Sequence, residues 1–203
     1  MYISIKFFFD FFFALFLIIF LSPVFVVVIL ILFLSRDSDI FFIHQRIGKN
    51  GKEFNLYKFR TMKHSRSKIL SEYFEKFPSK KKYWDENQKL KNDPRVTKIG
   101  YLLREFSLDE LPQILNVLKG EMSFVGPRPI VESEKQKYGE RFSSYKKVKP
   151  GLSGLWQVSG RNDTTYDKRV ELDYLYTQNI SFALDLKIFF KTIYVIMNRK
   201  GAY

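Results

Sequence analysis

The stretch FFFDFFFALFLIIFLSPVFVVVILILFL, residues 7–34, decides the fold class because it is almost wholly Phe, Leu, Ile and Val. As one helix it would be about 42 Å long, against roughly 30 Å of hydrocarbon in a bilayer. Ser22-Pro23 interrupts it, because proline lacks a backbone donor and clashes with the preceding turn. The resulting arms, about 24 Å and about 17 Å long, are each shorter than the hydrocarbon core.

We therefore expect residues 1–36 to form a broken, re-entrant membrane helix that enters and leaves the bilayer by the same face, with the Ser22 hydroxyl satisfying a backbone group freed at the break. Periodicity alone leaves a single-pass anchor equally open. The flank that follows becomes basic at Arg46, Lys49 and Lys52, which predicts that residues 37–203 lie on the cytoplasmic side of the membrane.

Composition limits the chemistry of those remaining residues. The chain has 34 Lys and Arg against 21 Asp and Glu, a net charge of +13. The only charged residues among residues 1–34 are Lys6 and Asp10, so residues 35–203 carry the whole excess. The excess points to an anionic partner: a phosphorylated substrate, anionic lipid or nucleic acid. With no cysteine and two histidines, the chain has no disulfide, thiol nucleophile, zinc finger or iron–sulfur cluster.

Residues 37–203 read as a mostly helical α+β domain containing a small β-hairpin. The hairpin spans residues 40–59 around Asn50-Gly51. Residues 63–91 are polar and basic, which favours a solvated or mobile insert over contact with anionic headgroups. Asp93-Pro94 predicts a helix start whose apolar stripe runs to Phe106. Further helices are expected at 111–119, 131–138, 167–179 and 182–198, the last of them either buried or interfacial.

The junction between the first two of these helices reads Ser107-Leu108-Asp109-Glu110-Leu111-Pro112. One interpretation is a capping box opened by Ser107. Pro112 weakens it, because Pro112 would then fall at the fifth helical position and remove a hydrogen bond. The other interpretation is chemical: adjacent carboxylates point about 100° apart on a helix. One of the pair can then bind a divalent cation such as Mg²⁺ while the other, held ionised, faces a phosphorus atom as a nucleophile.

Cations in constrained loops are candidates for phosphate contacts. Lys58 and Arg60 end the hairpin, Arg128 lies between two prolines, and Arg161 closes a glycine-rich loop. Neither a Walker A loop nor a G-x-G-x-x-G motif occurs.

These motifs resemble the bacterial sugar transferases, the small monotopic phosphoglycosyl transferases, over nearly the whole chain. The resemblance rests on the apolar segment with Ser22-Pro23 and on residues 57–62, 107–113, 116–129 and 150–162. Residues 83–97 and the terminal Gly201-Ala202-Tyr203 look like the branch of undecaprenyl-phosphate galactose phosphotransferases.

The resemblance implies transfer of a sugar-1-phosphate, in that branch galactose-1-phosphate, from a UDP-sugar to undecaprenyl phosphate. This step releases UMP and begins assembly of a surface glycan at the cytoplasmic face of the bacterial inner membrane. By resemblance, Asp109 forms a covalent aspartyl phosphosugar and Glu110 binds Mg²⁺. Direct metal-assisted transfer and a membrane-anchored nucleic-acid-binding protein are the competing hypotheses. The sequence leaves open which sugar is used and whether the chain forms a homo-oligomer.

Overall fold

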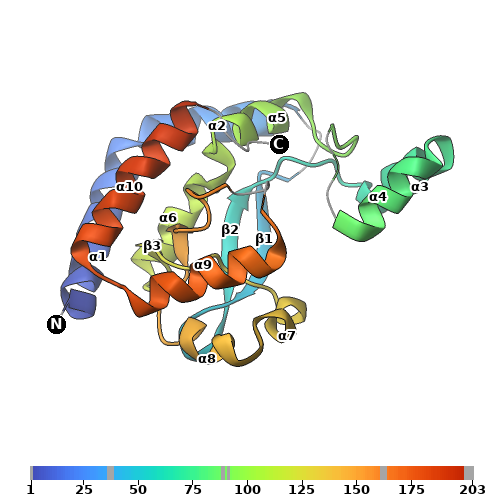
Figure 1. Ribbon diagram of the computed structural model, residues 1–203. Coiled ribbons are helices and arrows are strands. Elements are labelled where there is room, and N and C mark those ends of the chain that lie inside the picture. The colour runs from blue at the N-terminus through green and yellow to red at the C-terminus, as the bar shows by residue number, and fades with distance from the viewer. Residues whose placement is uncertain (1, 36–38, 88–89, 91, 161–163, 199–203) are drawn as a thin grey trace.

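The computed structural model describes residues 2–35, 39–87, 90, 92–160 and 164–198. The described chain is mostly helical and contains two separate two-stranded sheets (Figure 1). The predicted α+β class, with helices dominating and one small hairpin, is confirmed. The proposed boundary between residues 36 and 37 lies outside the described residues and stays a prediction.

The apolar N-terminus forms two helices, α1 (Tyr2–Phe20) and α2 (Ser22–Ser35), separated at the predicted break. The Ser22 hydroxyl donates to the Ile19 carbonyl oxygen at 2.8 Å. It thus satisfies the carbonyl that lacks a helical donor because Pro23 has no N–H, as expected. The expected length of the first arm was wrong. Helix α1 has 19 residues, is long and apolar enough to cross a membrane, and is 11% buried over that stretch. It is longer because it begins at Tyr2, before the apolar run, and its first turns are held by side-chain bonds from Tyr2 and Lys6 to Asp185.

Both apolar helices pack on the rest of the protein by one side only. Ala14 of α1 lies in the main core with Ile114 and Phe124, and Leu32 of α2 lies in a second cluster with Leu103. Their other sides expose large apolar side chains, among them Phe8, Phe12, Phe16, Phe20, Val26, Leu30, Phe33 and Leu34. This continuous apolar surface is what a bilayer would cover.

The hairpin is confirmed, with strands β1 (Phe41–Ile47) and β2 (Glu53–Phe59) pairing antiparallel from Phe41 opposite Phe59 to Ile47 opposite Glu53. The turn η1 (Lys49–Gly51) uses positive φ at Asn50 and Gly51, as that dipeptide predicts. The following polar segment forms α3 (Arg66–Lys76) and α4 (Pro78–Asn87). These helices project from the body as an exposed arm (Figure 1).

The next helix begins later than predicted. Helix α5 (Lys98–Glu105) is capped by Thr97, whose hydroxyl accepts from the Gly100 N–H at 2.9 Å. The predicted start at Asp93-Pro94 was wrong because residues 93–96 form a turn, in which Val96 N donates to the Asp93 carbonyl, and the chain then pairs with a distant segment. Val96 bridges Met62, and Thr97 N donates to the Thr61 carbonyl. Then follow the 3₁₀ turn η2 (Leu108–Gln113) and α6 (Ile114–Leu118), and Gly120 ends this segment as predicted.

The C-terminal half holds the second sheet and the last helices. Strands β3 (Ser123–Val125) and β4 (Gly151–Ser153) pair in parallel, and the sequence did not predict them. Between them lie η3 (Glu132–Glu134), α7 (Lys135–Tyr138), η4 (Gly139–Arg141) and α8 (Phe142–Tyr145), which confirm the short helix expected near 131–138. The two closing helices are also confirmed as α9 (Tyr166–Gln178) and α10 (Phe182–Met197).

The sequence left open whether the last helix, α10, is buried or interfacial. Asp185, Ile188 and Val195 face the protein and are buried. Phe190, Met197 and other large apolar side chains of the helix are exposed. The helix is therefore not buried on all sides. Like α1 and α2, it has one apolar face that no other part of the described chain covers.

Candidate active site

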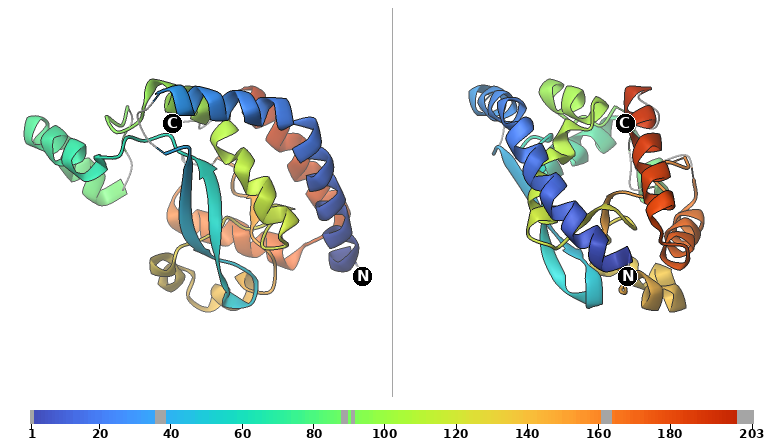
Figure 2. Two further views of the ribbon diagram at one scale, coloured as in Figure 1. Left: turned by 180° about the vertical axis from the view of Figure 1, so that it is seen from behind. Right: turned by 90° about the vertical axis from the view of Figure 1, so that its left-hand side faces the viewer.

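A cavity of about 860 Å³ brings together segments that are far apart in the sequence. The β1–β2 hairpin, η2, the end of α5, the loop around Arg128 and the loop around Trp156 supply its polar walls. Helices α1 and α10 supply apolar walls, and Figure 2 (right) shows these two helices on either side of the intervening loops. A polar substrate group and an apolar chain can thus meet in one space.

Five of the six predicted polar site residues line this cavity: Lys58, Arg60, Asp109, Glu110 and Arg128. The sixth, Arg161, lies outside the described residues. Ser22 and Pro23 do not line it, but Leu21, directly before the break, does.

Asp109 and Glu110 lie in a 3₁₀ turn rather than at a capped α-helix start. Ser107 has a φ of 55° and its side chain makes no capping hydrogen bond, so the capping-box interpretation is wrong. The positive φ turns the chain sharply at the end of α5, a conformation that costs a non-glycine residue free energy and occurs most often at functional sites.

Lys58 connects the two carboxylates. Its Nζ lies 2.6 Å from Glu110 Oε1 and 3.9 Å from Asp109 Oδ2. The hairpin places it there because β2 packs against η2. Asn116 of the following helix α6 also holds β2, because its Oδ1 accepts from Tyr57 N and its Nδ2 donates to the Asn55 carbonyl. Adjacent carboxylates repel each other, and the Lys58 ammonium group at these distances offsets that repulsion.

Burial raises the pKa of Asp109 to about 6. Lys58 opposes this rise, Glu110 adds to it, and Arg104 opposes it again. The Asp109 side chain is 13% exposed, whereas that of Glu110 is 31% exposed. Asp109 is therefore the more desolvated of the two, yet it is ionised at neutral pH, which suits a nucleophile.

Arg60 already has protein partners. Its Nη2 donates to the Phe41 carbonyl at 3.4 Å and lies 3.0 Å from Asp39 Oδ2. Arg128 stacks instead on an aromatic ring, with its guanidinium carbon 5.3 Å from the centroid of Trp156. Of these two predicted phosphate contacts, only Arg60 makes an ion pair within 4 Å of a carboxylate among the described residues.

Sequence reasoning missed several cations that complete the site. Arg104 reaches it from α5, with its Nε donating to Thr61 Oγ1 at 2.9 Å. Burial lowers the pKa of Arg104, and Asp109 opposes that shift. A signal was present in the sequence, because Arg104 precedes the carboxylate motif on a helix whose other face is apolar. Arg46 and Arg66 also line the cavity, and nothing in the local pattern distinguished them from surface residues.

The cavity is strongly basic. Its described lining residues include two carboxylates, Asp109 and Glu110, and six cationic side chains: Arg46, Lys58, Arg60, Arg66, Arg104 and Arg128. Such a site attracts a group carrying several negative charges, such as a diphosphate.

The same residues decide what kind of metal site fits. No group of three His, Asp or Glu side chains within the described ranges is placed to hold a metal ion on its own. Mg²⁺, however, is commonly held by one or two carboxylates together with substrate phosphates. Asp109 and Glu110 beside a phosphate-attracting cavity fit a Mg²⁺ ion that arrives with its substrate, and they do not fit a permanent structural metal.

The fold thus brings a pair of carboxylates, a cationic wall and apolar walls together in one cavity. The family model of the bacterial sugar transferases matches residues 1–199. The chain therefore belongs to the bacterial sugar transferase family, and it is a phosphoglycosyl transferase, as the motifs predicted.

Individual relatives agree with the family. The chain is 47% identical over 195 residues to the exopolysaccharide production protein ExoY of Sinorhizobium fredii, covering 96% of this chain and 86% of that protein. It is 49% identical over 177 residues to the UDP-galactose-lipid carrier transferase of Erwinia amylovora. It is 50% identical over 160 residues to the undecaprenyl-phosphate galactose phosphotransferase of Salmonella typhimurium.

These last two relatives are longer proteins. The matches cover 87% and 79% of this chain but only 37% and 34% of the relatives from Erwinia and Salmonella. The chain thus spans about a third of these relatives and most of the Sinorhizobium protein.

Proposed function

We propose that this protein transfers a sugar-1-phosphate from a UDP-sugar to undecaprenyl phosphate and releases UMP. The observation that carries the proposal is the single cavity in which a carboxylate pair, a cationic wall and apolar walls from α1 and α10 meet. The names of the relatives from Erwinia and Salmonella support the substrates, because one names UDP-galactose and a lipid carrier and the other names undecaprenyl phosphate and galactose.

The proposed chemistry has two steps at one phosphorus atom. An oxygen of the Asp109 carboxylate attacks the phosphorus that carries the sugar, and the bond to the bridging oxygen breaks, so UMP leaves with the bonding electrons. The product is an aspartyl phosphosugar. A phosphate oxygen of undecaprenyl phosphate then attacks the same phosphorus and the bond to Asp109 breaks. The carboxylate is regenerated, and one phosphoanhydride has been exchanged for another.

The protein supplies charge and position for these steps. Lys58, 3.9 Å from Asp109 and 2.6 Å from Glu110, offsets the two carboxylates as a phosphate approaches. Arg104 and Arg128 add positive charge to the walls. Glu110 is the proposed ligand of Mg²⁺, which when bound would neutralise charge on the diphosphate.

The lipid substrate would approach along the apolar walls. Leu17 of α1, Leu21 directly after α1, and Phe189, Ile193 and Ile196 of α10 line the cavity that contains Asp109. A polyprenyl chain against these side chains would leave its phosphate at the carboxylates. This arrangement supports placement of the cavity at the cytoplasmic surface of the inner membrane, where such a step would begin a surface glycan such as an exopolysaccharide.

For the membrane segment we propose a re-entrant course, supported by the break at Ser22-Pro23 and by the one-sided packing of α1 and α2. The chain has no cysteine, so Ser4→Cys and Ser79→Cys each introduce a unique label site. We expect a membrane-impermeant maleimide to label neither variant in intact cells and both after permeabilisation. Labelling of Ser4→Cys alone in intact cells would establish a single-pass anchor instead.

The activity itself is tested by UMP release with a panel of UDP-sugars. We expect UMP in an amount equal to the enzyme without undecaprenyl phosphate, because only the first step can occur, and continuous turnover when the lipid is added. Release from none of the UDP-sugars would refute the proposal. Binding of RNA or DNA that weakens steeply with salt would favour the alternative of a basic nucleic-acid-binding protein.

A further inference from the structure

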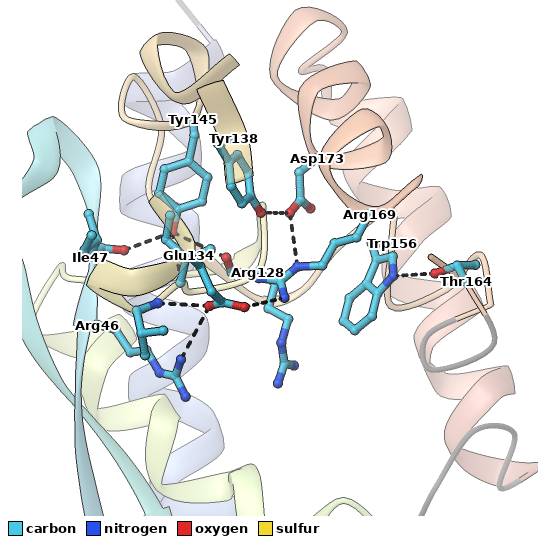
Figure 3. Close-up of polar contacts among 12 residues, drawn as sticks. Arg46, Ile47, Arg128, Glu134, Tyr138, Tyr145, Trp156, Thr164, Arg169 and Asp173 are labelled. Carbon is cyan, nitrogen blue, oxygen red and sulfur yellow. Dashed lines mark hydrogen bonds and ion pairs between the residues drawn. The ribbon is translucent and has the colours of Figure 1, made fainter. Parts of the chain in front are cut away.

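A buried network of charged and phenolic side chains lies behind the cavity wall that carries Arg46 and Arg128 (Figure 3). Tyr145 ties two segments of that wall together. Its hydroxyl donates to the Ile47 carbonyl at 2.9 Å and contacts the Arg128 carbonyl oxygen at 3.3 Å, and the residue is 2% exposed. The backbone on which both cavity arginines lie is thus held by one phenol.

Arg169 of α9 is the centre of the network. Its Nη1 donates to Glu134 Oε1 at 3.0 Å, and its Nε lies 3.9 Å from Asp173 Oδ2. Tyr138 donates its hydroxyl to Asp173 at 2.6 Å. The side chains of Arg169 and Asp173 are 8% and 1% exposed. Charges buried this deeply contribute little net stability, because desolvation offsets most of the attraction between them.

The network contacts both arginines of this cavity wall, Arg46 through Glu134 and Arg128 through Trp156. Glu134 Oε2 accepts from the Val131 N–H at 3.0 Å and lies 3.9 Å from Arg46 Nη1, so one carboxylate joins Arg169 to a cavity arginine. The Trp156 ring lies 5.3 Å from the guanidinium carbons of both Arg169 and Arg128. Arg46 and Arg128 are therefore each one contact away from Arg169.

The charges needed for this arrangement are present at neutral pH. Burial acts to raise the pKa of Glu134, but Arg169 and the Val131 N–H outweigh burial and hold it below its usual range. Burial, together with Arg128, lowers the pKa of Arg46 to about 10, which leaves it protonated.

We propose that Glu134, Tyr138, Arg169 and Asp173 are positioning residues that hold Arg46 and Arg128 against the phosphate of the leaving nucleotide. The inference rests on the proposed function and assigns this wall to the nucleoside diphosphate donor. The lipid is the less suitable occupant, because the apolar walls come from α1 and α10, whereas this wall comes from β1 and from the loops around Arg128 and Trp156. Fixed arginines bind a phosphate without first losing side-chain freedom.

Glu134→Gln tests this assignment, because it keeps the side-chain shape and removes the charge between Arg46 and Arg169. We expect the KM for the UDP-sugar to rise about tenfold, with kcat changed less than about threefold and the KM for undecaprenyl phosphate unchanged. Glu132→Gln is the matched control. It removes the same charge two residues earlier in η3, where the side chain is 65% exposed and pairs only with Lys135, and we expect it to change none of these constants.

Tyr138→Phe provides a second variant in case Glu134→Gln folds poorly. It removes one hydroxyl from Asp173 and keeps the ring, and the donor KM should again rise, by a few-fold. Lowered thermal stability with an unchanged donor KM in a folded variant would show a merely structural network. Equal rises in the KM of donor and lipid would show a general distortion. Either result overturns the proposal.

Direct binding of UMP separates this inference from the proposed function. By isothermal titration, we expect wild type to bind UMP and Glu134→Gln to bind it about tenfold more weakly. Equal UMP affinity of the two proteins, with normal transfer by wild type, would overturn only the positioning role. No UMP binding by wild type and no UMP release from any UDP-sugar would overturn both.

Discussion

Asp109→Asn is expected to lower steady-state UMP release by roughly a thousandfold or more, which is the typical effect of removing a catalytic nucleophile. The amide has nearly the same shape but cannot form the aspartyl phosphosugar. Because burial raises the pKa of Asp109, ionisation of this side chain disfavours the folded state, and the amide should leave the melting temperature equal or higher. The variant should therefore be folded, inactive and at least as stable as wild type.

Trapping of the intermediate shows whether the carboxylate is the nucleophile. With a UDP-sugar labelled in the sugar-bearing phosphate, wild type should retain label on the protein and Asp109→Asn should not. Asp167→Asn, an exposed acid in the first turn of α9, is the matched control and should behave as wild type. An Asp109→Asn protein that keeps most of its activity would instead favour direct metal-assisted transfer.

Lys58→Met is expected to lower kcat/KM by about a hundredfold, since a hydrogen bond to a charged group contributes about 1.5–3 kcal/mol. Methionine retains the length of the side chain but removes the ammonium group that lies 2.6 Å from Glu110 and 3.9 Å from Asp109. The two carboxylates would then repel each other without compensation from this side chain. An approaching diphosphate would also meet less positive charge.

The matched control is Lys119→Met, which removes an exposed lysine that contacts Tyr57, the neighbour of Lys58 on β2. It should leave kcat/KM within about twofold of wild type while making the same change in net charge. If both variants lose activity equally, general attraction of the substrate by the basic surface would explain the effect. The specific role of Lys58 at the carboxylates would then be wrong.

The elements that could be predicted are those in which neighbouring residues decide the conformation. The proline break after α1, the turn at Asn50-Gly51, the end of α6 shortly before Gly120 and the last two helices follow from local sterics and periodicity. The start of α5 was placed too early because Val96 and Thr97 pair with Met62 and Thr61, residues more than thirty positions away. No local pattern near Asp93-Pro94 reports that pairing.

The second sheet was missed for a related reason. Strands β3 and β4 have three residues each, too few for an alternating pattern, and they pair across an intervening stretch of more than twenty residues. The two segments pack so closely that a Cβ on Gly151 would lie only 2.1 Å from the Gly126 nitrogen, so this approach requires glycine. The sequence shows two glycines but not that they meet.

The candidate site also contains residues that local motifs predicted and residues that only the tertiary structure shows. Asp109, Glu110, Lys58 and Arg128 stand in recognisable motifs, and they line one cavity. The sequence alone determined the broken apolar segment, the hairpin and the adjacent carboxylates, because each depends on residues close together in the chain. Only the tertiary structure decided that Arg46 and Arg104 join them and that Arg169 lies behind the wall. A charged side chain acts on whatever lies within a few ångströms, and long-range folding determines those neighbours.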